Sequence, residues 1–128
     1  MRLAIDTNRY RDFCTGLPGA VERLARADEI LVPFVTLAEL RSGFLVGSRS
    51  RGNERVLTLF LNRPRVRVLF ADEGTCYQYG RLFAQLRGQG TPIPTNDIWL
   101  AALVIQHDLC LYSRDGHFKH LPQVPILD

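Results

Sequence analysis

Four acidic side chains occupy positions from which their carboxylates could act together, each at the end or start of a predicted element: Asp6, Glu39, Asp97 and Asp115. Like charges about 4 Å apart repel by about 4 kcal/mol at an effective dielectric constant of 20, so such a group needs a bound cation or raised pKa values. Oxygen ligands without a neighbouring His or Cys set favour Mg²⁺ or Mn²⁺ over zinc. Such a site suits phosphodiester hydrolysis, in which a cation activates water and neutralises phosphoryl charge.

Each of these acids also has a purely structural explanation. Glu39 fits a capping box with Thr36, and Asp97 would complement a helix dipole, which is worth about 0.3–1 kcal/mol. Asp115 could cap a short helical turn, and Asp6 could form an Asx turn. For any single acid the structural explanation is the commoner one. The case for a site therefore depends on all four acids lying at one edge of the fold.

Short apolar runs alternate along the chain with longer segments of helical periodicity. Strands are predicted at 3–5, 30–32, 66–69, 109–112 and 124–127, and helices at 18–28, 36–46, 53–62, 72–87 and 96–106. This alternation predicts a parallel sheet covered by helices on both faces. In such sheets ligands bind outside the carboxyl ends of the strands, the edge to which the four acids map. The helix at 72–87 is expected to bury Cys76, Tyr79, Phe83 and Leu86.

Composition places the chain among ordinary globular domains. Its 128 residues suit one domain, and a hydrophobic fraction of 46% with 23% charged residues allows a real core. No apolar run reaches the roughly 18–20 residues that a membrane helix requires, and the N-terminus lacks a signal-peptide pattern. Three cysteines without CxxC spacing favour a reducing compartment, so we expect the chain in the cytoplasm.

The net charge of +3 comes almost entirely from arginine, because Lys119 is the only lysine. Six arginines cluster between residues 49 and 67. The planar guanidinium group binds phosphate well, so the charge permits a nucleic-acid partner. A solvated helical face explains the same cluster equally well.

Four short segments occur in an order that is characteristic of one protein family: Asp6-Thr7-Asn8, Thr36–Leu40, Asn96–Ala102 and Tyr112–Phe118. Together they resemble the PIN-domain nucleases, specifically the VapC-type toxins of bacterial toxin–antitoxin pairs, over nearly the whole chain. The resemblance implies one PIN-like domain over residues 1–128, a three-layer α/β/α sandwich with four or five mainly parallel strands. It also implies a Mg²⁺- or Mn²⁺-dependent endoribonuclease that cleaves RNA and is inhibited by a cognate antitoxin, and we expect a homodimer.

The resemblance also suggests roles for individual residues. By position, Asp6, Asp97 and Asp115 resemble the metal ligands, and Glu39 the catalytic acid that binds the metal or holds its water. Ser113 replaces a usual threonine and keeps a hydroxyl that could contact that water. Asn8 resembles a residue that orients Asp6 from outside the ligand set.

Two features are open to more than one interpretation. His117 stands where many relatives carry a further acid; it could donate a proton to the leaving oxygen, but a surface or capping role is the commoner one. The helices over 36–46 and 53–62 are rich in apolar residues for a short hairpin. Core packing explains part of this, and an antitoxin groove or a dimer face would explain any excess.

The main alternative is a non-enzymatic module with an acidic metal pocket, either partner-binding or a phosphoacceptor of signalling type. A phosphoacceptor would need paired acids after the first strand and a lysine near the last. Here Thr7 and Asn8 follow Asp6, and Lys119 falls in a predicted helical turn. The nuclease is therefore the favoured hypothesis.

Overall fold

The structure, a computed structural model, describes all residues 1–128 and is built around a five-stranded sheet. Its elements follow one another in this order: β1 (Arg2–Ile5), α1 (Thr7–Cys14), α2 (Pro18–Arg26), β2 (Glu29–Pro33), α3 (Phe34–Val46), α4 (Ser50–Leu61), β3 (Val66–Leu69), α5 (Glu73–Gln89), α6 (Thr95–Gln106), β4 (Cys110–Tyr112), the 3₁₀ turn η1 (Gly116–His120) and β5 (Ile126–Leu127).

All five strands are parallel, in the order β3-β2-β1-β4-β5, which confirms the predicted sheet. The central strand β1 pairs with β2 on one side and with β4 on the other. The register between β1 and β4 places Ile5 beside Tyr112. The residues that follow these two strands therefore start from neighbouring points at one edge of the sheet.

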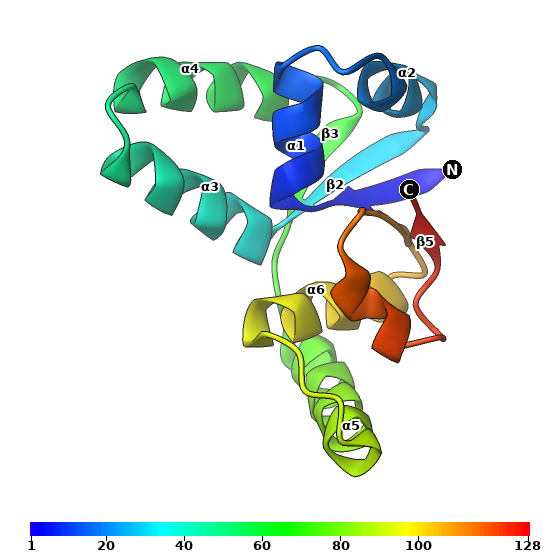
Figure 1. Cartoon of the computed structure of the whole chain (residues 1–128). Coiled ribbons are helices and arrows are strands. Elements are labelled where there is room, and N and C mark those ends of the chain that lie inside the picture. Colours follow the sequence, from blue (N-terminus) through cyan, green and yellow to red (C-terminus); the bar gives the residue numbers. More distant parts are fainter.

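Alternate residues along each strand point to opposite faces of the sheet and divide the core into two halves. Ala4, Leu31 and Leu111 are buried with α5, α6 and η1 on one face. Leu3 and Ile5 are buried with α1, α2, α3 and α4 on the other. Figure 1 shows these helical layers on either side of the strands. The fold is the three-layer α/β/α sandwich that the sequence led us to expect.

The connections that flank the sheet centre lie on opposite faces. The helices α1 and α2 link β1 to β2 on one face, whereas α5 and α6 link β3 to β4 on the other. The helices connected to β1 and those connected to β4 therefore lie on opposite faces of the sheet. In open α/β sheets such an arrangement leaves a crevice outside the carboxyl ends of the strands, where ligands bind.

Local hydrogen bonds determine where the helices α5 and α6 begin and end. The Asp72 side chain accepts from the Thr75 N–H at 3.1 Å, and the Thr75 hydroxyl accepts from the Asp72 N–H at 3.0 Å, which forms a capping box. Gly90 then ends α5 in the left-handed region at φ 72°, a conformation that favours glycine. Helix α6 starts directly after Pro94, so Asp97 lies in its first turn.

Helix α1 is absent from the sequence-based prediction, and the largest shift of a predicted helix start is that of α4. The apolar periodicity does not predict α1, because its buried residues are only Arg9 and Tyr10 and the rest of the helix is largely polar. Helix α4 begins at Ser50, three residues before the predicted start at Asn53.

The buried face of α5 also differs from the prediction. Leu86 is buried as expected, but Cys76 is exposed and Phe83 is 45% exposed. The buried residues are instead Thr75 and Leu82. The capping box turns Thr75 inward where α5 packs along α6, and this rotates the buried face away from Cys76 and Phe83.

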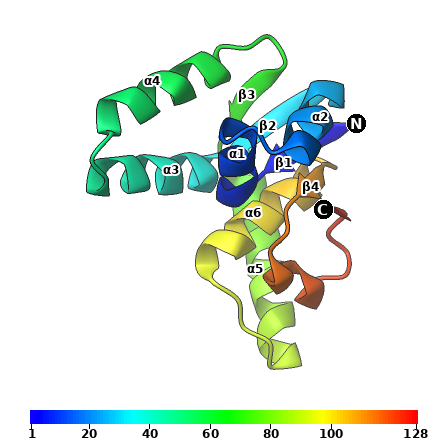
Figure 2. The same cartoon turned by 45° about the horizontal axis from the view of Figure 1, so that its top comes forward.

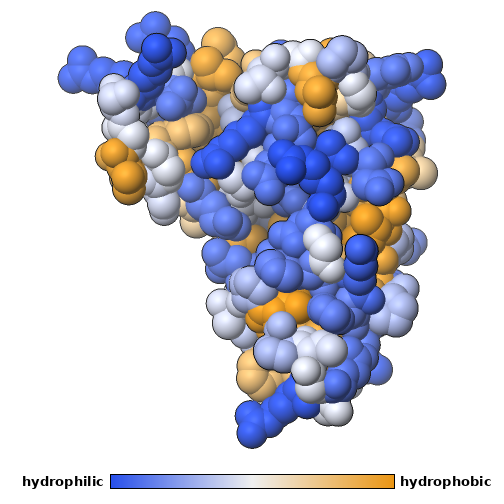
Figure 3. Space-filling view, in the orientation of Figure 1, coloured by the Kyte–Doolittle hydropathy of each residue, from blue (hydrophilic) through white to orange (hydrophobic).

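The helices α3 and α4 form an arm that projects beyond the sheet (Figure 2). Leu57 and Phe60 of this arm are buried, so core packing accounts for part of its apolar content. Other apolar residues are exposed, and Figure 3 shows apolar surface over the arm. The exposed large apolar residues of the arm are Leu45, Val46, Val56 and Leu59.

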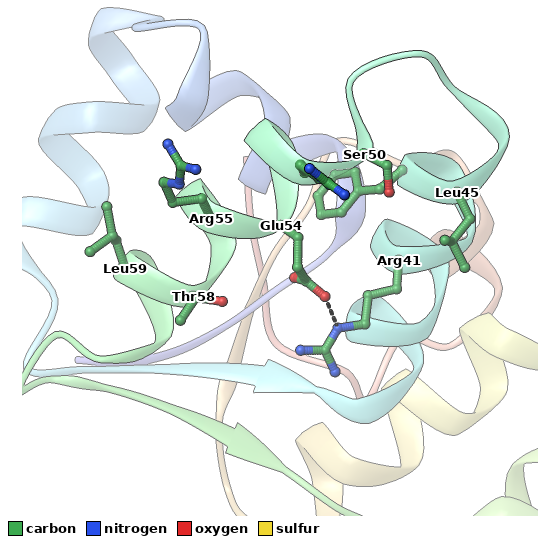
Figure 4. Close-up of a pocket in the computed structure, with 9 residues that line it drawn as sticks. Arg41, Leu45, Ser50, Glu54, Arg55, Thr58 and Leu59 are labelled. Carbon is green, nitrogen blue, oxygen red and sulfur yellow. Dashed lines mark hydrogen bonds and ion pairs between the residues drawn. The ribbon is translucent and has the colours of Figure 1, made fainter.

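A cleft of about 620 Å³ lies between α3 and α4. Across it Arg41 Nε donates to Glu54 Oε1 at 2.8 Å (Figure 4). Arg51 and Arg55, two of the clustered arginines, line the same cleft.

No helix in the chain combines the length and the apolar character needed to cross a membrane. Cys14 and Cys76 are exposed, and Cys110 is partly buried in β4.

Candidate active site

Asp6 directly follows β1 and uses both of its carboxylate oxygens. Oδ1 accepts from the Arg9 N–H at 2.9 Å, so Asp6 is the N-cap of α1. Oδ2 accepts from the Ser113 hydroxyl at 2.5 Å. Asp6 can therefore cap α1 with one carboxylate oxygen and contribute the other to a site.

Ser113 directly follows β4 and is only 1% exposed. Its hydroxyl donates to Asp6 and accepts from the Asp115 N–H at 3.0 Å. One buried hydroxyl thus connects the residues after β1 with those after β4. The strand register between Ile5 and Tyr112 already places these segments side by side.

Asp97, Asp115 and His117 lie close together at the same edge. Asp115 caps η1 by accepting from the His117 N–H at 2.9 Å, as the structural explanation anticipated. His117 Nδ1 is 2.7 Å from Asp97 Oδ2 and 3.1 Å from Asp115 Oδ1. One potential ligand atom from each of the three residues lies within 4.8 Å of the others. The sequence favours a surface or capping role for His117, because these contacts arise only in the folded chain.

Glu39 reaches the edge from α3. The capping-box explanation is wrong for this residue, because α3 begins at Phe34 and has no side-chain cap. The buried Thr36 hydroxyl instead donates to the carbonyl oxygen of Ile5 at 3.0 Å and holds α3 against the end of β1. Burial and the negative charges of Asp97 and Asp6 raise the pKa of Glu39, but Glu39 lies outside the cluster of Asp97, Asp115 and His117.

Asn8 does not orient Asp6 in the structure. Its side chain is exposed, and the hydrogen bonds to Asp6 come from the Arg9 N–H and the Ser113 hydroxyl. Residue 8 lies in the first turn of α1, which directs its side chain outward while the cap forms through the backbone of Arg9. The structure gives the orienting contact to Ser113.

Burial raises the pKa of three of the four carboxyl groups. Desolvation is the largest cause for Asp6, Glu39 and Asp97. Neighbouring carboxylates raise the pKa of each group further, whereas hydrogen bonds from Ser113 to Asp6 and from His117 to Asp97 oppose the rise. The chain therefore holds mutually repelling acids at one place, an arrangement that a cation would stabilise.

The chemistry of the donor set fits a divalent cation. Asp97 and Asp115 offer the carboxylate oxygens that Mg²⁺ and Mn²⁺ prefer, and His117 adds one imidazole nitrogen beside both. Asp6 lies outside this cluster and is connected to Asp115 through the Ser113 hydroxyl. The buried hydroxyl of Ser113 fixes one carboxylate in place.

The raised pKa of Asp97 predicts how the metal-free chain responds to pH. A carboxyl group whose folded pKa is raised contributes stability below its ordinary value, here 3.8, and loses this contribution as pH rises through the folded value. In EDTA at pH 7, Asp97→Asn should therefore melt a few degrees above the wild type, and the difference should shrink toward pH 4. Thermal unfolding followed by circular dichroism measures this. A variant that is less stable at pH 7, or a difference that widens on acidification, would contradict the expectation.

The fold is that of a known class of domain. Residues 5–124 match the PIN domain, and the chain belongs to this family. Within the family it is similar to the VapC ribonucleases. It is 30% identical to Ribonuclease VapC4 of Mycobacterium tuberculosis (strain ATCC 25618 / H37Rv) over 96 residues, which are 75% of this chain and 74% of the relative.

Solved structures show the same likeness in three dimensions. VapBC-1 from nontypeable Haemophilus influenzae matches with a TM-score of 0.89 and 27% identity over 100% of this chain and 98% of the other. VapBC-5 from Mycobacterium tuberculosis, described as a member of the VapBC family of toxin–antitoxin systems, matches with a TM-score of 0.76 and 25% identity over 98% and 97%. The resemblance found in the sequence is thus confirmed.

Proposed function

We propose that this chain is the toxin of a toxin–antitoxin pair and an endoribonuclease that hydrolyses RNA with Mg²⁺ or Mn²⁺. The observation that carries the proposal is the cluster of Asp97, Asp115 and His117, which the Ser113 hydroxyl connects to Asp6 at the carboxyl ends of β1 and β4. Membership of the PIN family and similarity to VapC ribonucleases support it.

The side chains divide the work of hydrolysis among them. Asp6, Asp97 and Asp115 would hold the cation, which would supply activation of water and neutralisation of charge on the phosphoryl oxygens. Glu39 accepts the proton of the attacking water at a carboxylate oxygen, a role that its raised pKa favours. Ser113 keeps Asp6 oriented, and His117 Nδ1 fixes the spacing of Asp97 and Asp115.

The proposed partners follow from the same comparisons. A cognate antitoxin is the expected inhibitor, since VapBC-5, to which the chain is similar, belongs to a family of toxin–antitoxin systems. The exposed apolar residues of the α3–α4 arm give a protein partner, antitoxin or second protomer of a homodimer, a surface to cover. We place the chain in the cytoplasm as a single nuclease domain over residues 1–128, where RNA is available and its cysteines stay reduced.

Incubation of the purified chain with single-stranded RNA tests the nuclease. Cleavage is expected with Mg²⁺ or Mn²⁺, none with EDTA, and recovery when the cation is restored. Because water is the nucleophile, the products should carry no 2′,3′-cyclic phosphate. Cleavage that persists in EDTA would come from another enzyme, and intact RNA with either cation would refute the proposed activity.

A further inference from the structure

Three charged residues form a continuous chain of ion pairs beside the proposed site. Arg9 Nη1 lies 3.2 Å from Asp12 Oδ2, both in α1. Arg114, in the segment after β4, donates to the same carboxylate from Nε at 3.1 Å and from Nη2 at 3.3 Å. A single acid in α1 therefore joins the helix that starts at Asp6 to the segment that carries Ser113 and Asp115.

Two of the three side chains, Arg9 and Asp12, are largely shielded from water, whereas Arg114 is 53% exposed. The Arg9 side chain is 9% exposed and the Asp12 side chain 16%. The guanidinium of Arg9 lies over the ring of Tyr112, 4.3 Å from its centroid, and its Nε has no hydrogen-bond partner. Exposed ion pairs contribute little, but removing one partner from a buried pair leaves an uncompensated charge. Asp12 is the only acid that pairs with either arginine.

The position of Arg114 gives these contacts a functional meaning. Ser113 and Arg114 are adjacent, yet the first bonds to Asp6 and the second to Asp12, so the segment is held at two points of α1. The Ser113 hydroxyl also fixes Asp115 through its backbone N–H. Movement of the segment away from α1 would separate Asp6 from Asp115.

We propose that Asp12 is a positioning residue, which acts through Arg114 to hold the segment after β4 so that Asp6 and Asp115 bind the cation together. The inference rests on the proposed metal-dependent function. Residues that support metal ligands from outside typically contribute 10–100-fold to metal affinity or activity. Asp12 is expected to act on cation binding and on turnover, and not on binding of RNA.

The experiment compares Asp12→Asn with Glu22→Gln. Both variants remove one negative charge, but Glu22 pairs only with Arg26 on the exposed surface of α2, at 2.8 Å. Mn²⁺ affinity is measured from the free-ion signal in electron paramagnetic resonance, and kcat and KM from RNA cleavage at saturating Mn²⁺. Asp12→Asn should weaken Mn²⁺ binding about 10-fold or more and lower kcat, with KM changed less than about twofold. Glu22→Gln should match the wild type in all three.

A second variant keeps the proposal testable if Asp12→Asn folds poorly. Arg114 is 53% exposed, so Arg114→Gln should fold and show the same loss of Mn²⁺ affinity. The double variant should lose little more than Asp12→Asn alone, because Arg114 is proposed to act only through Asp12.

The outcomes separate this inference from the proposed function. Wild-type Mn²⁺ affinity in both single variants would overturn the positioning role, as would losses that simply add in the double variant. A raised KM with unchanged Mn²⁺ affinity in Arg114→Gln would also overturn it, since Arg114 would then contact RNA directly. If the wild type binds Mn²⁺ but leaves RNA intact, the proposed nuclease activity is refuted. The Mn²⁺ affinities of the variants then still decide whether Asp12 is a positioning residue.

Discussion

Asp97→Asn is expected to reduce RNA cleavage about 10³-fold without unfolding the chain. The amide keeps the size of the carboxylate and can still accept from His117 Nδ1, which lies 2.7 Å from Asp97 Oδ2. It removes the negative charge that a divalent cation requires. Metal ions supply several kcal/mol of charge stabilisation to such reactions, and about 4 kcal/mol corresponds to a factor of 10³. Initial rates on a fluorescent single-stranded RNA at saturating Mn²⁺ provide the measurement.

Asp108→Asn is a matched control for this loss. Asp108 is exposed in the turn between α6 and β4 and has φ 53°, a conformation that asparagine adopts as readily as aspartate. The control variant should cleave RNA at the wild-type rate. Equal rates for Asp97→Asn and the wild type, with both variants folded, would exclude Asp97 from the site.

Mn²⁺ is expected to stabilise the folded chain strongly. A ligand that binds only the folded state, at about 100 times its dissociation constant, adds about 2.7 kcal/mol to the free energy of unfolding. For a domain of this size the melting temperature should rise by about 10 °C. The gain is large because the cation binds its ligands and offsets both the burial and the repulsion that raise the pKa values of Asp6 and Asp97. Differential scanning calorimetry at pH 7, with and without EDTA, measures the shift.

The same measurement on variants locates the binding site. Asp97→Asn should lose most of the Mn²⁺-dependent shift, and Asp108→Asn should keep it. A shift that is equal in all three proteins would mean that the ion binds elsewhere on the chain. The wild type should also fall below Asp97→Asn in melting temperature when EDTA is present and rise above it when Mn²⁺ is added.

The strands and the acids were predictable from the sequence for the same reason. Buried parallel strands are short apolar runs with clear ends, so β1 to β4 could be recognised from residues such as Leu3 to Ile5 and Val66 to Leu69. A polar residue that directly follows such a run therefore lies at a defined edge of the sheet. Asp6 and Asp115 were therefore assigned to one edge before any contact between them was known.

The contacts that orient the acids could not be predicted, because they join distant parts of the chain. Thr36 resembled the first residue of a capping box, yet its hydroxyl bonds to the carbonyl of Ile5, 31 positions away. Arg114 pairs with Asp12 across 102 positions. Side-chain spacing within one helix gives no sign of such pairs. For the same reason His117 was interpreted from its local surroundings, and its contact with Asp97 was missed.

Helix faces were predictable only where one apolar stripe dominates. In α5 the predicted stripe runs through Cys76 and Phe83 and the buried one through Thr75 and Leu82, and both share Leu86. Hydropathy favours neither. The capping box at Asp72 and Thr75 selects the second, which is an effect of hydrogen bonding and not of apolar burial.

The bond between Ser113 and Asp6 spans 107 positions of the chain, so the first carboxylate meets its partners only when β4 has been made. During translation the ribosome must release nearly the whole polypeptide before these residues can pair. A nascent or prematurely terminated product carries Asp6 without Ser113 or Asp115 and should leave transcripts intact. The proposed nuclease activity is therefore expected of the finished molecule and not of its abandoned fragments.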